Sequence, residues 1–218
     1  MGRPREHDDR MACALLDAAE RILQADGPDA LSIRHVAEDA GTTTRAVYSL
    51  FGSRDGLIVA LAVRAFRTLG AGVSELPRTD DPSEDLVGVA LTVFRRFTLE
   101  HRGLFRIAFQ RQGASPVVAR RFVPSAREAL GNLHDRVGRV LDAAPESQAV
   151  ADATVGFHAL CEGLATLELR SVLPVGREER IWRGTITAFV AGLNGSGALV
   201  RCSSPDFGKL PVMTTEPR

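Results

Sequence analysis

Five polar side chains between residues 42 and 48 are spaced so that they could contact one ligand surface. They are Thr42, Thr43, Thr44, Arg45 and Tyr48. The planar guanidinium of Arg45 can donate two hydrogen bonds to O6 and N7 of a guanine, a pairing that contributes ~1–3 kcal/mol of base discrimination. Thr43 and Thr44 suit base edges or thymine methyl groups, and Thr42 suits a phosphate. The competing interpretations are a surface salt bridge for Arg45 and helix capping for the threonines.

The elements that must position these side chains are two short helices joined by a glycine turn. An apolar stripe at three- and four-residue intervals predicts a first helix from near Ser32, and Gly41 ends that helix. Thr42 or Thr43 can cap the second helix. The apolar positions of the two helices are Ile33, Val36, Ala37 and Ala40, and then Ala46, Val47, Leu50 and Phe51. The polar side chains of the second helix are left facing outward, as a recognition helix in a major groove requires.

Residues 10–60, about a quarter of the chain, resemble the TetR family of transcriptional regulators. MACALLDAAERILQ is similar to the first helix of that family, GPDALSIRHVAEDAG to the second, and TTTRAVYSLFGSRDGLI to the third and the start of the fourth. The resemblance implies that Tyr48 and Arg54 bind phosphates, which sets position rather than sequence preference. Arg34 could contact a phosphate or a base. Arg3 and Arg5 form either a DNA-binding arm or a solvated tail.

Charge limits how this chain could bind DNA. The formal net charge is zero, and residues 1–56 hold seven arginines and ten acidic residues, a net charge of −3. This balance argues against binding by bulk electrostatic attraction and predicts modest non-specific affinity, with specific affinity that depends on dimerisation. The alternative is a helical protein-interaction module that has lost specific DNA binding.

Composition predicts a cytoplasmic protein, associated with the nucleoid when it is bound to DNA. The chain has 218 residues, 44% of them hydrophobic, without a run of about 18 apolar residues or an apolar segment near the N-terminus. We therefore expect neither a membrane partner nor a secretory signal. Cys13, Cys161 and Cys202 follow no metal-ligand pattern, so we expect free thiols, no metal and no cofactor.

The helical periodicity predicts an all-α fold with an N-terminal three-helix DNA-binding domain and a larger C-terminal helical domain for ligand binding and dimerisation. The expected domains are residues 10–56 and 57–194, followed by a disordered tail at 195–218. Further helices are expected from Ser53 to Glu75, from Pro82 to near Glu100, in LFRIAFQ, at 116–141 with a kink at Pro124, at 148–173 and at 177–193.

The larger domain contains candidate residues for a small apolar effector. HRGLFRIAFQ and FHALCEGLATLEL resemble segments of C-terminal domains with a Trp-His-Gly signature, which here reads Cys161-Glu162-Gly163. Aromatic residues with a few polar groups are typical of small-molecule sites. The candidates are Phe97, Phe105, Phe109, Phe122, His158, Cys161 and Glu162. Ordinary core packing, and a structural pairing of His158 with Glu162, are the competing interpretations.

The last two helices carry apolar residues at helical spacing. The candidate interface residues are Leu164, Leu167, Trp182, Ile186, Phe189 and Leu193. Burial within their own domain would also explain this pattern, but the family resemblance implies a four-helix dimer interface. Two copies related by a two-fold axis would bind half-sites about 34–36 Å apart, or a multiple of that spacing, in a palindromic operator. The resemblance further implies repression relieved by a ligand, with activation left open.

Catalysis is not expected from this sequence. The five histidines, His7, His35, His101, His134 and His158, are scattered along the chain. Neither a nucleophile elbow nor an H-E-x-x-H metal motif is present. The sequence therefore predicts a sequence-specific DNA-binding regulator, and not an enzyme.

Overall fold

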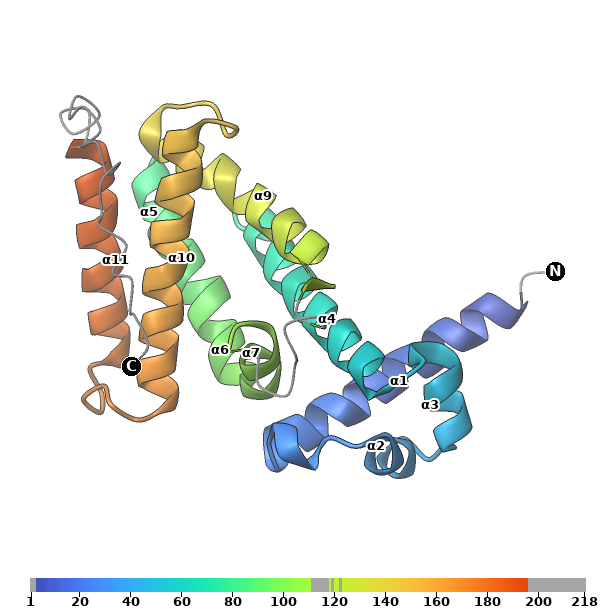
Figure 1. Ribbon diagram of the computed structural model, residues 1–218. Helices are drawn as coiled ribbons and strands as arrows, with labels where there is room; N and C mark the ends of the chain where they lie inside the picture. The colour runs from blue at the N-terminus through green and yellow to red at the C-terminus, as the bar shows by residue number, and fades with distance from the viewer. Residues whose placement is uncertain (1–2, 111–117, 119, 122, 196–218) are drawn as a thin grey trace, which may run out of the picture.

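The computed structural model describes residues 3–110, 118, 120, 121 and 123–195, and the regular elements in this part of the chain are all helices (Figure 1). The all-α fold class is confirmed. The predicted tail after residue 195, the predicted helix start at residue 116 and the candidate Phe122 lie outside the described residues.

The N-terminal part consists of α1 (Arg3–Ala25), the short 3₁₀ turn η1 (Pro28–Ala30), α2 (Ile33–Asp39) and α3 (Thr44–Phe51). Leu15, Ala18 and Ile22 of α1 are buried with Val36 of α2 and Val47 of α3. The segment around Arg3 and Arg5 is helical, since α1 begins at Arg3, and both the DNA-binding arm and the solvated tail stay predictions. Pro4 does not prevent this start, because the first turn of a helix does not use the N–H group that proline lacks.

The helix α4 (Arg54–Glu75) runs through the centre of the molecule and joins its two parts (Figure 1). Its N-cap Ser53 accepts a 3.0 Å hydrogen bond from the backbone N–H of Gly56. Among the described helices, α4 alone is long and apolar enough to cross a membrane by length and composition. Its apolar residues are instead packed against α1, α3, α7 and α9, so the core accounts for its composition.

The larger part contains α5 (Pro82–Gly88), η2 (Val89–Arg95), α6 (Arg96–Glu100), α7 (Arg102–Ala108), α9 (Val123–Leu141), α10 (Gln148–Leu169) and α11 (Glu178–Gly195). The predicted helix over 82–100 is interrupted, because η2 is a π-helical segment. The helix begins at Pro82 as predicted, and Asp81 caps it by accepting hydrogen bonds from the N–H groups of Ser83 and Glu84. Pro124 lies in the first turn of α9 instead of kinking a longer helix.

Arg136 on α9 holds the C-terminal end of α4. Its guanidinium is almost fully buried and donates 2.8 Å hydrogen bonds to the carbonyl oxygens of Val73 and Pro77, and a further one to Leu76. The last carbonyl groups of a helix lack partners within the helix. One buried side chain therefore binds the last turn of the central helix and fixes the segment that follows it.

Glu168 of α10 joins three helices. Both of its carboxylate oxygens accept hydrogen bonds from Arg95 of η2, at 2.8–3.2 Å. The indole N–H of Trp182 on α11 donates to Oε2 at 2.7 Å. The prediction that Trp182 and Ile186 face a second copy of the chain is wrong, since both are fully buried. They pack inside their own domain, where α11 lies against α5, η2, α9 and α10.

We expect Arg136→Ala to lower the free energy of unfolding by about 2–5 kcal/mol, because it leaves buried carbonyl groups without a donor. Chemical denaturation measures the loss. Arg127→Ala, at an exposed position on the same helix, is the control and should change stability by less than about 0.5 kcal/mol. Equal effects of the two substitutions would contradict the role assigned to Arg136.

Candidate functional site

The turn between α2 and α3 is built by local hydrogen bonds. Ser32 caps α2 by accepting from the N–H of His35 at 3.1 Å. Gly41 has a φ of 63°, a conformation that favours glycine, and reverses the chain. Of the two threonines that could cap α3, the structure selects Thr43, whose hydroxyl accepts from the N–H of Ala46 at 3.3 Å. Thr43 therefore has a structural role, whatever contact it makes with a ligand.

The outer side of α3 carries the exposed residues Thr44, Arg45, Tyr48 and Ser49, and we call this predicted DNA-contacting side the recognition surface. The side chain of Val47 is buried on the opposite side of the helix. Tyr48 is 54% exposed, a high value for a large aromatic residue. Within the described residues Arg45 has neither an ion pair nor a hydrogen bond from its side chain, so its guanidinium is available for an external acceptor.

The acidic residues of α2 are neutralised by neighbouring arginines. Arg34 pairs with Glu38 at 2.7 Å, and Arg21 pairs with Asp39 at 2.6 Å. The side chain of Arg34 is 84% exposed, and exposed ion pairs contribute little to stability. Both acidic residues of α2 are therefore paired locally, while the net charge of residues 1–56 stays at −3, and Arg34 can exchange its carboxylate partner for a phosphate at low cost.

Arg54 faces inward. Its Nε donates to the carbonyl of Leu31 at 2.9 Å, and Nη2 donates to that of Pro28 at 3.3 Å. These bonds fix the segment that leads into α2 against the start of α4. A phosphate contact by Arg54 stays a prediction, but the structure gives this residue a positioning role that the sequence did not indicate.

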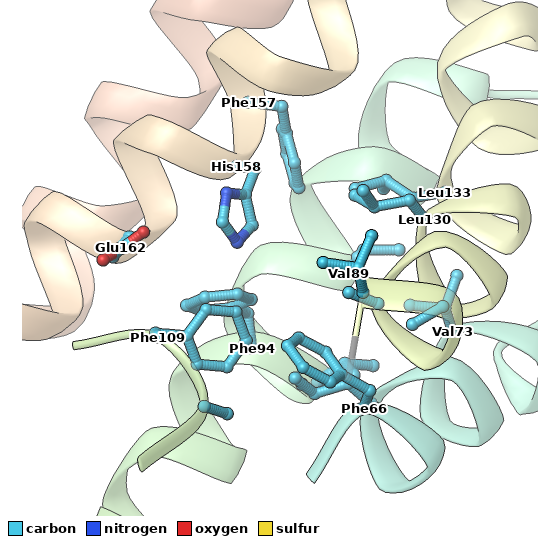
Figure 2. A pocket seen from close by; sticks show the side chains of 16 residues that line it. Phe66, Val73, Val89, Phe94, Phe109, Leu130, Leu133, Phe157, His158 and Glu162 are labelled. Carbon is cyan, nitrogen blue, oxygen red and sulfur yellow. The ribbon is translucent and has the colours of Figure 1, made fainter. Parts of the chain in front are cut away.

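The larger part encloses an apolar cavity of about 230 Å³. Figure 2 shows its lining side chains converging from α4, η2, α7, α9 and α10. Of the candidate ligand residues, Phe109, His158 and Glu162 line it. Phe97, Phe105 and Cys161 are packed in the core instead, which corrects the prediction that they face a ligand. The buried Cys161 thiol has a raised pKa because burial disfavours the thiolate.

Sequence reasoning missed most of the cavity wall. Phe66, Leu69 and Val73 are spaced at helical intervals on α4, which was a usable signal. The remaining lining residues are Val89, Val93, Phe94, Ala108, Val123, Ala126, Ala129, Leu130, Leu133 and Phe157. Their convergence depends on how helices distant in the sequence pack together, so no local pattern could indicate it.

Aromatic rings surround His158 inside the cavity. Its ring lies 5.9 Å from that of Phe94 and 5.4 Å from that of Phe109, measured between centroids. Phe66 packs edge-on against Phe109 at 5.4 Å. Burial lowers the pKa of His158, and the charge of Glu162 opposes this shift in part. His158 is therefore mainly neutral at pH 7.

Two family models match this chain. "Bacterial regulatory proteins, tetR family" matches residues 15–61, and "Tetracyclin repressor-like, C-terminal domain" matches residues 89–189. The chain belongs to the TetR family. It is thus a DNA-binding transcriptional regulator, a class of protein that is normally not enzymatic.

A curated relative of this TetR-family chain is the HTH-type nicotine-responsive transcriptional repressor HdnoR of Paenarthrobacter nicotinovorans. The two are 35% identical over 83 residues, which is 38% of this chain and 41% of that repressor. The match thus spans less than half the length of either protein.

Solved structures share the fold. A protein of unknown function from Rhodococcus sp. RHA1 is 24% identical, with a TM-score of 0.71 over 84% of this chain and 95% of its own. The regulator FadR of Bacillus subtilis, in complex with stearoyl-CoA, is 10% identical, with a TM-score of 0.66 over 82% of this chain and 96% of its own. At these identities the likeness concerns the fold alone.

The two arginines of the N-terminal part should differ in their effect on stability. Arg54→Ala is expected to lower the free energy of unfolding by about 1–3 kcal/mol, because it removes donors to two carbonyl groups. Arg45→Ala should change it by less than about 0.5 kcal/mol. Thermal or chemical unfolding of the two variants tests this difference, and a destabilising effect of Arg45→Ala would show a hidden structural role.

Proposed function

We propose that this regulator is a ligand-responsive repressor that binds a palindromic operator as a homodimer in the cytoplasm. One observation carries the proposal: the unpaired Arg45 on α3 and the apolar cavity lie at opposite ends of one continuous buried helix, α4. The start of α4, where α3 presents Arg45, suits base recognition. Its C-terminal half, which lines the cavity, suits a small effector.

The proposed dimer surface is the outer face of α10 and α11, which lie side by side at the edge of the molecule away from α1–α3 (Figure 1). The middle of this face carries exposed residues that are small or apolar and recur at helical spacing: Val155, Ala159, Gly163 and Leu167 on α10, and Gly184, Ala188 and Ala191 on α11. Charged residues, Asp152 and Arg180, lie at its ends. A methyl group at Gly163 or Gly184 would meet no atom within 4 Å, so a second helix can approach closely.

Of the interface residues expected from the sequence, Leu167 lies on this outer face and is 38% exposed. Phe189 and Leu193 are half-buried at its margin, and Leu164 is buried. The proposed surface therefore consists mainly of small residues between the large apolar ones, which point into the domain. Two-fold pairing through such a surface would set the distance between two recognition helices.

Coupling between effector and operator would pass through α4 and α1. Phe66, Leu69 and Val73 of α4 line the cavity, while its first turns pack against α1 and α3. A second link joins α1 to the α6–α7 junction, where Glu20 contacts His101 and Gln24 bonds to Glu100 and Gly103. An effector that favours another position of these helices would weaken operator binding by a coupling free energy of ~1–3 kcal/mol.

The relatives support a ligand response, but they do not identify the ligand of this chain. One relative is by name a nicotine-responsive repressor, and one structural neighbour was solved with stearoyl-CoA. These ligands differ widely in size and charge, so the fold does not select the effector. The effector of this chain must be inferred from its own cavity.

We expect Arg45→Ala to weaken operator binding by about 5- to 150-fold, because a bidentate contact to guanine contributes ~1–3 kcal/mol. Fluorescence anisotropy on duplexes tiled across the DNA flanking the gene, at two salt concentrations, identifies the operator and measures the loss. Arg127→Ala on α9 is the control and should bind as the wild type does. Uniformly weak binding that is insensitive to Arg45 would contradict the proposal and favour a protein-interaction module.

Ala188→Asp is expected to produce a monomer, because it places a charge in the proposed interface, and to weaken operator binding as a result. Sedimentation measures the mass, and Thr68→Asp, at an exposed position on α4, is the control. Trp182→Asp is unsuitable as a test, since Trp182 is buried and the change would destabilise the domain itself. An Ala188→Asp variant that remains dimeric would exclude this surface.

A further inference from the structure

The polar groups of the cavity are confined to one place. Sixteen of the described residues line the cavity, and fourteen of these are apolar. The two exceptions, His158 and Glu162, lie one turn apart on α10 and therefore share a helix face (Figure 2). A ligand that fills the cavity thus meets hydrocarbon along most of its surface and a polar contact at α10.

The charge at this place is negative and has no partner. Within the described part of the chain Glu162 forms neither a hydrogen bond nor an ion pair, although it is partly buried. Among the described residues, the lining contains neither lysine nor arginine. A carboxylate without a partner among the described residues, at the wall of an apolar cavity, repels an anionic ligand and attracts a cation or a hydrogen-bond donor.

The neighbouring groups also suit a cation. The Phe94 and Phe109 rings lie within 6 Å of the His158 ring, beside the polar end of the cavity. Aromatic faces attract ammonium groups most strongly where water is excluded. His158 is mainly neutral at pH 7, so it adds no competing positive charge, and one of its ring nitrogens can accept a hydrogen bond.

The size of the cavity limits the ligand. Its volume of about 230 Å³ exceeds the roughly 150 Å³ of an apolar cavity known to bind benzene, and lies just below the ~300 Å³ at which typical ligand pockets begin. One substituted ring or a small bicyclic molecule would fill it. A long acyl chain with a large polar head would not fit.

We propose that the effector is a small amine that carries a ring and is protonated at pH 7, with the ring among Phe66, Phe94 and Phe109 and the ammonium group in contact with Glu162 and His158. This inference rests on the proposed function, since it names the ligand class for the same cavity. It also separates this chain from regulators of the same fold whose ligands carry a negative charge.

Isothermal titration calorimetry at pH 7 with three probes of similar size tests the charge preference. The probes are N,N-dimethylbenzylamine as the cation, benzyl methyl ether as the neutral molecule and phenylacetate as the anion. We expect the amine to bind at least about tenfold more tightly than the ether, because its contact with Glu162 is charge-assisted, and phenylacetate to bind most weakly. This order is measured on the wild-type protein and needs no variant.

Two matched variants then test whether the preference for the amine over the ether depends on Glu162. Glu162→Gln keeps the shape of the side chain and removes its charge, so the amine should lose its advantage and bind within about threefold of the ether. Asp152→Asn removes the same charge from an exposed position on the same helix, outside the cavity, and should retain the wild-type order. Ala126→Phe, which fills the cavity, should abolish binding of the amine.

Three outcomes would overturn the amine assignment: equal or tighter binding of the ether or phenylacetate, a preference unchanged in Glu162→Gln, or binding of none of the probes. Operator binding is measured separately by anisotropy with saturating amine. If the amine binds with the expected preference but leaves operator affinity unchanged, the ligand-class assignment stands and the proposed ligand response fails. The two failures are therefore distinguishable.

Discussion

The structure depends on the burial of α4 along nearly its whole length. This helix is the shared core of both parts of the molecule, so it cannot shift at one end without disturbing the packing at the other. Both of its ends are also fixed. A Cβ atom at Gly56 would lie 1.8 Å from the carbonyl oxygen of Phe51, so the missing side chain lets α3 turn directly into α4. At the other end Arg136 donates to the carbonyl group of Val73 in the last turn of α4 and to those of Leu76 and Pro77, which follow the helix.

Local signals were sufficient for the helix-turn-helix and most helix starts. Ser32, Ser53 and Asp81 cap helices as their sequence context predicts, and Gly41 has the positive φ expected of a helix-ending glycine. The π-helical turn at Val89–Arg95 could not be predicted, because its residues have ordinary helical periodicity. The extra residue per turn is stabilised by tertiary packing, including the bonds between Arg95 and Glu168.

The candidate site was less predictable, because side-chain direction depends on how the helices pack. Phe105 and Phe109 lie one turn apart, yet Phe105 is fully buried in the core and Phe109 faces the cavity. Composition could not distinguish them. Trp182 shows the same difficulty: its size and spacing suit an interface equally well, but the carboxylate that accepts its N–H lies on a neighbouring helix of the same domain. Only the three-dimensional contacts separate these alternatives.

The proposed dimer surface and the proposed amine site both include residues of α10. One face of this helix carries His158 and Glu162 toward the cavity, and its exposed face carries Val155, Ala159 and Gly163 toward the proposed partner. Because Glu168 ties α10 to both η2 and α11, a ligand that draws Glu162 inward would move these three elements together rather than α10 alone. Such a motion would shift the dimer surface and the η2 wall beside α4 at once. An unpaired charge on α10 is therefore well placed to change the distance between two recognition helices.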